Sequence, residues 1–532
     1  MTGTLRIVLL LIITAAPSAW LRADQSIAQS RRQATLTPLA VVGFDAAAEL
    51  DERDQWMPTA IEEMLGRRLR RVPGLTVIPN ARAHQARREL AESGAAPLVE
   101  WQRVIAALGG KLWLRGTCAG TPAATVLDLK LIDLARPDAE PVHTRCGPGR
   151  LFDALDEATQ WVLQQQRVTR LDDAIHKLVF APPAASPSAL QYYAKALTAA
   201  RAEDLRNAAY YGGQALEYDG QNRPALLLMA KLELRGSRAT RRRAVLHLRQ
   251  MKELATASAD SVDEGEFELA RGLLDLAGQS FEPARQRFES ALSMAHERDD
   301  PYGQIDAMSA LSDLWLSMQP PPRSQASAEA LRTFKQRNLG QAAEWQRLVL
   351  DMLAQAGDVV AEAPAANKLA MIHERLEQPE QALEMHQRTV AAARKSGSAR
   401  NEATGLLFLG QWYRRHERWQ EALDATTRCL ALAQDDAKPR VRITLAEIYR
   451  AMPRLLEALG QYESAYEALA DGEDLLNQCV CLRAIAELKM ELGERAAAIQ
   501  KMEEALDIAH ALELQDEPAL RKQLDEWKKA AP

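Results

Sequence analysis

The feature that most constrains the fold of this chain is a spacing that recurs in its C-terminal two-thirds. In three places a large apolar residue is followed thirteen positions later by alanine: Leu369 and Ala382, Leu409 and Ala422, Ile485 and Ala498 (382 − 369, 422 − 409 and 498 − 485). The first two pairs begin 40 residues apart (409 − 369). Antiparallel helices approach closely only where one of them presents a small side chain at the crossing. The pattern therefore predicts a series of helical hairpins that stack on one another.

Residues 188–530 are predicted to be all-α. In the clearest unit Gly410 joins Ala422 as a small residue at the crossing, and Leu409 and Tyr413 share one helix face because they are four positions apart. Less regular units are centred on 208–219, 284–292 and 465–469. A run of three prolines within Gln319–Arg323 predicts a loop that interrupts the pattern. We expect about seven hairpins.

Residues 37–180 have a different pattern, in which short apolar runs alternate with helical segments. In one run Leu127, Leu129 and Leu131 alternate with Asp128 and Lys130, as in a half-buried strand. Strands are predicted at 39–44, 75–78, 112–118, 125–133 and 142–146, and helices at 54–71, 81–93, 97–108 and 151–178. The proline-rich stretch 181–187 is predicted to be a linker. The fold class is therefore mixed, with a small α/β domain at 37–180 followed by an all-α helical-hairpin solenoid at 188–530.

Four segments of the α/β region carry a resemblance to a known family: Phe44-Asp45, Glu62–Leu65, Pro73–Val77 and the hairpin Leu114–Leu134. In this layout the region is similar to the N-terminal domain of the periplasmic TolB proteins. It also resembles the domain that precedes tetratricopeptide (TPR) repeats in the extracytoplasmic parts of bacterial signalling proteins. Residues 188–530 resemble the longer type of TPR repeat. This resemblance implies an array in which the first helix of each hairpin lines a groove that holds a peptide or a helix.

When the groove positions of TPR proteins are transferred to the three clearest units, they correspond to seven polar or adaptable residues. These residues lie on the face away from the packing residues. They are Asn367, Met371, Glu374, Gln411, Arg414, Arg483 and Glu487. The resemblance implies that these side chains bind a protein or peptide partner. For each residue taken alone, plain solvent exposure is the competing interpretation.

The N-terminus is typical of an export signal. Arg6 precedes an apolar run, Ile7–Ile13, and a segment of small residues follows at 14–19. We expect a signal peptide at 1–23 and a disordered leader at 24–36. The alternative is an uncleaved N-terminal membrane anchor. Either interpretation predicts a bacterial protein outside the cytoplasm, which is periplasmic or secreted in the first case and membrane-anchored in the second.

No enzymatic chemistry is indicated by the sequence. It contains no phosphate-binding Gly-rich loop, no nucleophile elbow and no His-Glu-x-x-His zinc motif. The five cysteines, at 118, 146, 429, 479 and 481, are an odd number and lack metal-ligand spacing. Cys118 and Cys146 are predicted on strands that flank a third strand, so we expect no disulfide bond between them. We predict no catalytic residues, no metal and no cofactor.

Two basic clusters, Arg67–Arg71 and Arg235–Arg243, contrast with a net charge of −6. Neither is interleaved with aromatic residues, so nucleic acid is not an expected partner. The second cluster could contact an acidic partner or anionic lipid, but we interpret it as a solvated helix start. We therefore expect an extracytoplasmic, non-catalytic scaffold that binds a protein or peptide. The alternative is the sensory or regulatory part of a signalling protein whose cytoplasmic effector module is absent or encoded upstream.

Overall fold

In the computed structural model the described residues are 37–91, 97–320, 327–470, 472 and 474–529. The chain divides into two units, Met1–Thr37 and Pro38–Pro532, and all helices and strands below belong to the second. The predicted signal peptide at 1–23 and leader at 24–36 lie outside the described residues. Among the described helices, none has the length and apolar content that a membrane crossing requires.

The α/β region is built on a five-stranded sheet of order β2-β1-β3-β4-β5. The strands are β1 (Leu39–Ala46), β2 (Val77–Ile78), β3 (Leu112–Thr121), β4 (Ala124–Asp133) and β5 (Val142–Gly149). The first strand is parallel to β2 and β3, whereas β3, β4 and β5 form an antiparallel meander. The five predicted strands are thereby confirmed. Cys118 and Cys146 lie on β3 and β5, on either side of β4, and both are free thiols.

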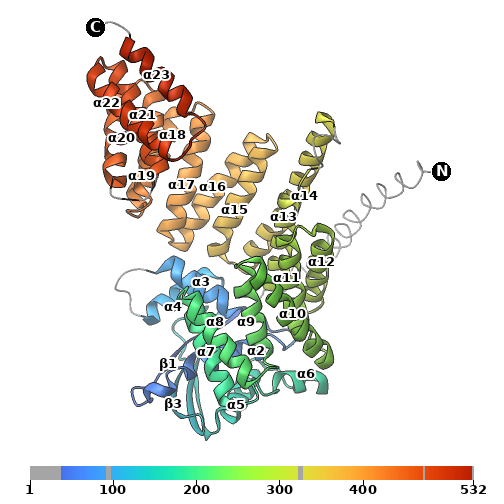
Figure 1. Ribbon diagram of the computed structural model, residues 1–532. Coiled ribbons are helices and arrows are strands. Elements are labelled where there is room, and N and C mark those ends of the chain that lie inside the picture. Colours follow the sequence, from blue (N-terminus) through green and yellow to red (C-terminus); the bar gives the residue numbers. More distant parts are fainter. Residues whose placement is uncertain (1–36, 92–96, 321–326, 471, 473, 530–532) are drawn as a thin grey trace, which may run out of the picture. The chain divides into compact units, whose positions relative to one another are not determined.

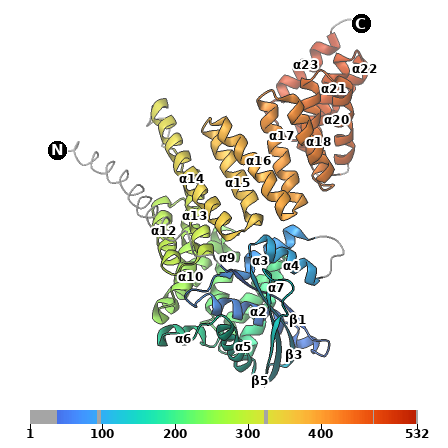
Figure 2. The ribbon, with the colours of Figure 1, turned by 180° about the vertical axis from the view of Figure 1, so that it is seen from behind.

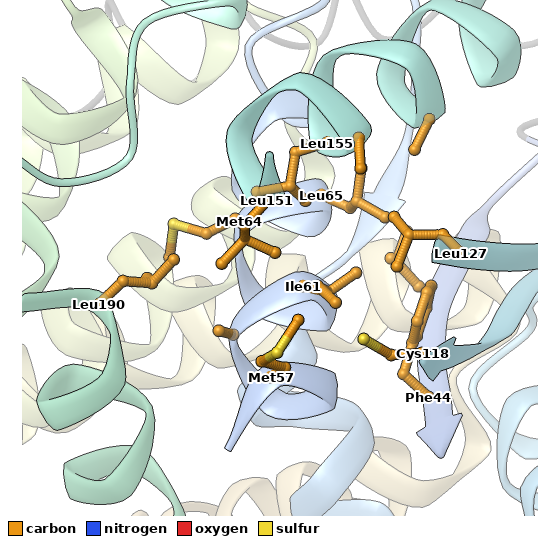
Figure 3. Close-up of a cluster of buried hydrophobic side chains, with 14 of the residues drawn as sticks. Phe44, Met57, Ile61, Met64, Leu65, Cys118, Leu127, Leu151, Leu155 and Leu190 are labelled. Carbon is orange, nitrogen blue, oxygen red and sulfur yellow. The ribbon is translucent and has the colours of Figure 1, made fainter. Parts of the chain in front are cut away.

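Helices cover both faces of this sheet because side chains alternate along its strands. On β1, Leu39 and Val41 join one apolar cluster and Ala40 and Val42 join another. The first cluster, shown in Figure 3, contains Leu127 of β4 together with side chains of α2 (Met57–Leu69) and α5 (Leu151–Gln165). The second cluster receives side chains from α3 (Asn80–Leu90) and α4 (Pro97–Ala107).

The helix predicted at 151–178 is two helices, so this prediction was wrong. After α5 the backbone enters the left-handed region at Arg167, with φ of 56°. A second helix, α6 (Asp173–Val179), begins at Asp172, whose carboxylate accepts a hydrogen bond from the backbone N–H of Ile175. A side-chain cap of this kind stabilises a new helix start, which helical spacing alone does not reveal.

Eight helical hairpins and a final helix follow (Figures 1 and 2). They are α7 (Pro187–Arg201) with α8 (Leu205–Tyr218), α9 (Arg223–Leu234) with α10 (Arg238–Ser258), α11 (Ser261–Ala277) with α12 (Phe281–Glu297), α13 (Pro301–Ser317) with α14 (Ala328–Ala356), α15 (Val359–Arg375) with α16 (Pro379–Ser396), α17 (Ala399–Arg415) with α18 (Trp419–Leu432), α19 (Lys438–Ala451) with α20 (Leu455–Leu469), α21 (Leu475–Glu491) with α22 (Arg495–Ala511), and α23 (Glu517–Lys529). About seven hairpins were predicted, and the predicted fold class is confirmed. The boundaries 37–180, 181–187 and 188–530 stay predictions.

The crossing at the clearest repeat depends on small residues, as the spacing predicted. Ala422 is completely buried, and a Cβ atom added at Gly410 would lie 2.4 Å from Oγ1 of Thr426. The two helices α17 and α18 can therefore approach only because Gly410 has no side chain. In the same repeat, Leu409 and Tyr413 are buried in one cluster with Val441 of the next hairpin.

Candidate functional site

All seven residues selected from the sequence lie on the first helices of hairpins. Asn367, Met371 and Glu374 are on α15, whereas Gln411 and Arg414 are on α17 and Arg483 and Glu487 are on α21. Consecutive first helices, such as α15 and α17 or α17 and α19, are in contact with each other. These helices place the seven side chains along one succession of neighbouring helices, but not in one site.

Asn367 and Met371 line a pocket of about 240 Å³ that three successive hairpins form. Its lining comes mainly from α15, with Leu316 from α13, Thr389 from α16, and Asn401 and Thr404 from α17. Met371 is 45% exposed, and its sulfur lies 4.0 Å from the amide nitrogen of Asn367. The amide oxygen of Asn367 is buried and has no hydrogen-bond partner within the described part of the chain.

The rim of this pocket is cationic and its interior is largely apolar. Lys368 is paired with Asp313 of α13 at 2.6 Å. Arg375, one helical turn beyond Met371, is exposed, and no ion pair to it is formed by the residues described. Leu316 and Ile372 supply apolar surface. The pocket can therefore accept an apolar side chain and, beside it, a negatively charged group.

Four of the other selected residues take part in ion pairs with neighbouring helices or turns. Glu374 accepts hydrogen bonds from Arg415 of α17 at 2.6 Å and pairs with His386 of α16 at 2.9 Å. Burial raises the pKa of Glu374, but His386 and Arg415 outweigh this effect and lower it overall. Similar pairs join Arg414 to Glu447 at 3.1 Å, Glu487 to Arg450 at 2.7 Å, and Arg483 to Asp516 at 3.0 Å. Gln411 accepts through its backbone oxygen from Arg415. The four ion-paired residues therefore connect successive helical units, whereas Gln411 is bonded within α17.

Sequence reasoning missed the other residues that line the pocket with Asn367 and Met371. The polar ones among them are Lys368, Arg375, Thr389, Asn401 and Thr404. Arg375 was within reach of the sequence pattern, because Asn367, Met371 and Arg375 recur at four-residue steps on one helix face. Asn401 and Thr404 lie on the next hairpin, so spacing within one helix gives no signal for them.

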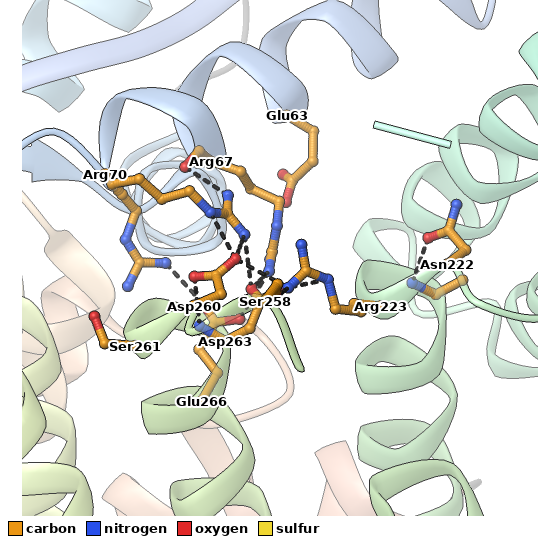
Figure 4. Close-up of polar contacts among 12 residues, drawn as sticks. Glu63, Arg67, Arg70, Asn222, Arg223, Ser258, Asp260, Ser261, Asp263 and Glu266 are labelled. Carbon is orange, nitrogen blue, oxygen red and sulfur yellow. Dashed lines mark hydrogen bonds and ion pairs between the residues drawn. The ribbon is translucent and has the colours of Figure 1, made fainter. Parts of the chain in front are cut away.

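The arginines of the first basic cluster are ion-paired with carboxylates of the helical array. Figure 4 shows Arg67 of α2 and Arg70, which directly follows α2, beside carboxylates of α11. Arg67 pairs with Asp263 at 2.7 Å, and Arg70 pairs with Glu266 at 2.8 Å. Burial raises the pKa of Glu266, but Arg67 and Arg70 outweigh it and hold that pKa far below its ordinary value. The cluster thus joins the α/β region to the third hairpin.

The α/β region contacts the turns between hairpins, where first helices begin. The capping carboxylates Asp260, Asp300 and Asp358 start α11, α13 and α15, and they pair with Arg71, Arg70 and Arg82 at 2.7, 3.4 and 2.8 Å. Ser398, which caps α17, donates a hydrogen bond to the backbone oxygen of Glu89. Four consecutive first helices therefore begin against the α/β region.

No metal-binding cluster is present among the described residues. They contain no group of three or more His, Cys, Asp or Glu side chains placed to hold an ion. Burial raises the pKa of the Cys118 thiol to about 12 and that of the Cys429 thiol to about 11, which disfavours the thiolate form that metals bind.

Comparison with known proteins identifies tetratricopeptide repeats in one part of the array. A sequence model described as "Tetratricopeptide repeat" matches residues 361–435, which extend from α15 to just beyond α18. No curated protein sequence matches the chain. The comparisons indicate no catalytic family.

Three solved structures show similarity at low identity. One is the signal-transduction ATPase with a TPR sensor from Pyrococcus horikoshii, which is 13% identical. The match covers 71% of this chain and 57% of the ATPase chain, with a TM-score of 0.47. The apo form of RapI is 13% identical, with coverage of 64% and 97% and a TM-score of 0.42. The apo quorum sensor NprR from B. thuringiensis is 13% identical, with coverage of 64% and 98% and a TM-score of 0.36. The likeness of residues 37–180 to the TolB family stays a prediction.

Proposed function

Because the helical part of this chain is an array of hairpins that includes a tetratricopeptide-repeat match at residues 361–435, we propose that the chain is a non-catalytic scaffold that binds an extended peptide segment of a protein partner. The pocket on α15 carries this proposal. It is formed mainly by first helices, which are the helices that line the peptide groove in the TPR proteins that the sequence resembles.

The chemistry of the pocket defines the segment that it would take. A side-chain amide can both donate to and accept from a peptide backbone, and the amide oxygen of Asn367 is without a partner among the described residues. Met371 adapts its shape to varied apolar side chains because a thioether chain is flexible. Arg375 would pair with a carboxylate. The expected ligand is therefore an extended segment with an apolar residue next to an acidic one.

The contacts of the α/β region support a scaffold role. They fix the starts of α11, α13, α15 and α17, and the pocket lies between the last of these helices. Asn401 lines the pocket and also donates to the carboxylate of Glu89 on α3 at 3.3 Å. A peptide in the pocket would thus lie beside Asn401, which is already hydrogen-bonded to the α/β region.

We place this activity outside the cytoplasm on the basis of the N-terminal sequence. Cell fractionation, with the mature N-terminus read by mass spectrometry, tests the location. A periplasmic chain that starts near Asp24 supports a cleaved signal, whereas a membrane-bound chain that starts at Met1 supports an anchor. Recovery of a longer chain with a cytoplasmic module would favour the alternative sensory role.

Selection of peptides from a displayed random library, with the purified chain as the target, tests the binding proposal. We expect selected peptides to share adjacent apolar and acidic residues. Arg375→Glu should weaken their binding at least tenfold, which is about 1.4 kcal/mol. Asn367→Ala should weaken binding independently of peptide charge.

The matched control is Arg332→Glu, which makes the same charge change at an exposed position on α14. It should leave peptide affinity within about twofold of the parent value. The proposal fails if no peptides are enriched, or if the Arg332 and Arg375 variants bind the selected peptides equally well.

A further inference from the structure

The second basic cluster lies on α10, the second helix of its hairpin, and the peptide-binding proposal does not use it. Between Glu233 and Glu253 the sequence has six arginines and one lysine and no acidic residue. This is a strong local excess of positive charge in a chain whose net charge is −6. The pocket on α15 includes no residue of α10.

Three arginines of this segment are exposed and available to a partner. Arg235, Arg242 and Arg249 form no ion pair with the residues that the structure describes. By contrast, Arg243 pairs with Glu233 at 3.2 Å, and Lys252 pairs with Glu268 at 3.5 Å. The nearby carboxylates Glu233 and Glu268 are therefore already paired, and they do not neutralise the three exposed arginines.

An apolar side chain lies between two of these arginines. Leu246 is 60% exposed, and it follows Arg242 by four positions and precedes Arg249 by three, so all three share one face of α10. The opposite face packs into the array through Ala244, Leu248 and Met251. The exposed face of α10, defined by Arg242, Leu246 and Arg249, is therefore an outward-facing basic face with an aliphatic residue at its centre.

We propose that this exposed face of α10 binds the surface of a membrane that contains anionic phospholipid. Guanidinium groups pair bidentately with phosphate oxygens, and basic residues near such a surface each contribute about 1 kcal/mol of attraction. Leu246 inserts among the headgroups, as apolar residues of amphipathic surface helices do. A protein partner fits less well, because interfaces between proteins centre on aromatic residues, and α10 contains no Phe, Trp or Tyr.

Vesicle flotation with the full chain tests the proposal. One set of vesicles contains phosphatidylcholine alone, and the other contains phosphatidylcholine mixed with phosphatidylglycerol. We expect stronger binding to the mixed vesicles, with a salt dependence that the neutral vesicles do not show. Neutral vesicles measure any contribution of the apolar N-terminal segment, which should be the same for every variant.

Substitutions on α10 assign the effect to this face. Arg242→Gln with Arg249→Gln should reduce partitioning to mixed vesicles about 30-fold, roughly fivefold for each arginine. Leu246→Ala should reduce it without changing the salt dependence. The control pair, Arg337→Gln with Arg347→Gln, removes the same charge from exposed positions on α14 and should change partitioning less than about twofold.

Three results would overturn the proposal. They are equal binding to neutral and mixed vesicles, equal effects of the α10 and α14 pairs, and loss of an acidic protein partner from the α10 variants with unchanged vesicle binding. Peptide binding by the groove is independent of this face, so the Arg375 and Asn367 variants should partition like the parent chain. Circular dichroism spectra of all variants verify that the fold is retained.

Discussion

Arg71 donates two hydrogen bonds to one carboxylate oxygen of Asp260, which is 189 residues further along the chain, at 2.9 Å from Nε and 2.7 Å from a terminal nitrogen. The side chain of Asp260 is 1% exposed and that of Arg71 is 9% exposed. Arg223 approaches the same carboxylate at 3.1 Å. The contact therefore belongs to a buried network that joins α2, α9 and α11.

Replacement of Arg71 by leucine should destabilise the protein by about 2–3 kcal/mol, because a buried carboxylate loses its closest cation while Arg223 compensates in part. Denaturant unfolding measures the change. Arg136→Ala is the matched control, since Arg136 is 77% exposed and pairs with Asp133 on the surface. Its cost should stay below about 0.5 kcal/mol. Equal costs for the two variants would show that the buried network does not form in solution.

Stability should decrease as the pH falls below about 5. Burial raises the pKa of Asp260, but Arg71 and Arg223 outweigh it and hold the pKa below its ordinary value. Burial likewise opposes the effect of His84 and Arg201 on Glu62, whose pKa is also lowered overall. A lowered folded-state pKa gives stability that is complete above the unfolded-state value, near ~4, and is lost as the pH falls through the folded-state value.

Denaturant unfolding between neutral and acid pH tests this dependence. Asp260→Asn should be less stable than the parent chain at neutral pH and should lose less stability on acidification, because its amide does not titrate. An unfolding free energy that increases as the pH falls below 5 would contradict the sign of the prediction.

Two glycines within helices should respond to alanine in opposite directions. At Gly410 the added methyl group would meet Oγ1 of the completely buried Thr426, so Gly410→Ala should cost about 1–3 kcal/mol. At Gly460, inside α20, nothing lies within 4 Å of the added atom. Gly460→Ala should therefore stabilise by up to about 1 kcal/mol, because alanine has the higher helix propensity. Thermal unfolding measures both variants. Unfolding temperatures that shift in the same direction would refute the predicted crossing.

The cysteines should be unreactive in the native protein. All five are buried, and burial raises the pKa of the Cys481 thiol to about 12 and that of Cys146 to about 11. A thiol reagent at mildly alkaline pH should modify them only after denaturant is added, since the thiolate is the reactive form. Ala239→Cys, at an exposed position on α10, supplies a reactive control. Rapid native labelling of more than the control thiol would contradict this prediction.

Features that depend on neighbours in the sequence were predictable. Alternation along β4 placed Leu127, Leu129 and Leu131 on the buried face, where the structure has them. The thirteen-residue spacing located the crossing of Gly410 with α18. Both signals come from the geometry of one strand or one hairpin, which the residues of that element determine by themselves.

Features that depend on distant partners were not predictable. A run of arginines such as Arg67–Arg71 is typical of a solvated helix, and only the fold brings α11 to it. The pocket on α15 was predicted only in part, because some of its lining residues come from other hairpins. Asn367 and Met371 follow from helix spacing, whereas Leu316 and Asn401 enter from adjacent hairpins.

The capping residues Asp260, Asp300, Asp358 and Ser398 each start a helix and also hold the α/β region. An insertion or deletion in the turn before any of these residues would rotate the cap away from its partner. The turns before α19 and α21 have no such contact with the α/β region among the described residues. Gain or loss of the last two hairpins would therefore leave the first six in their arrangement, because the contacts with the α/β region end at the start of α17.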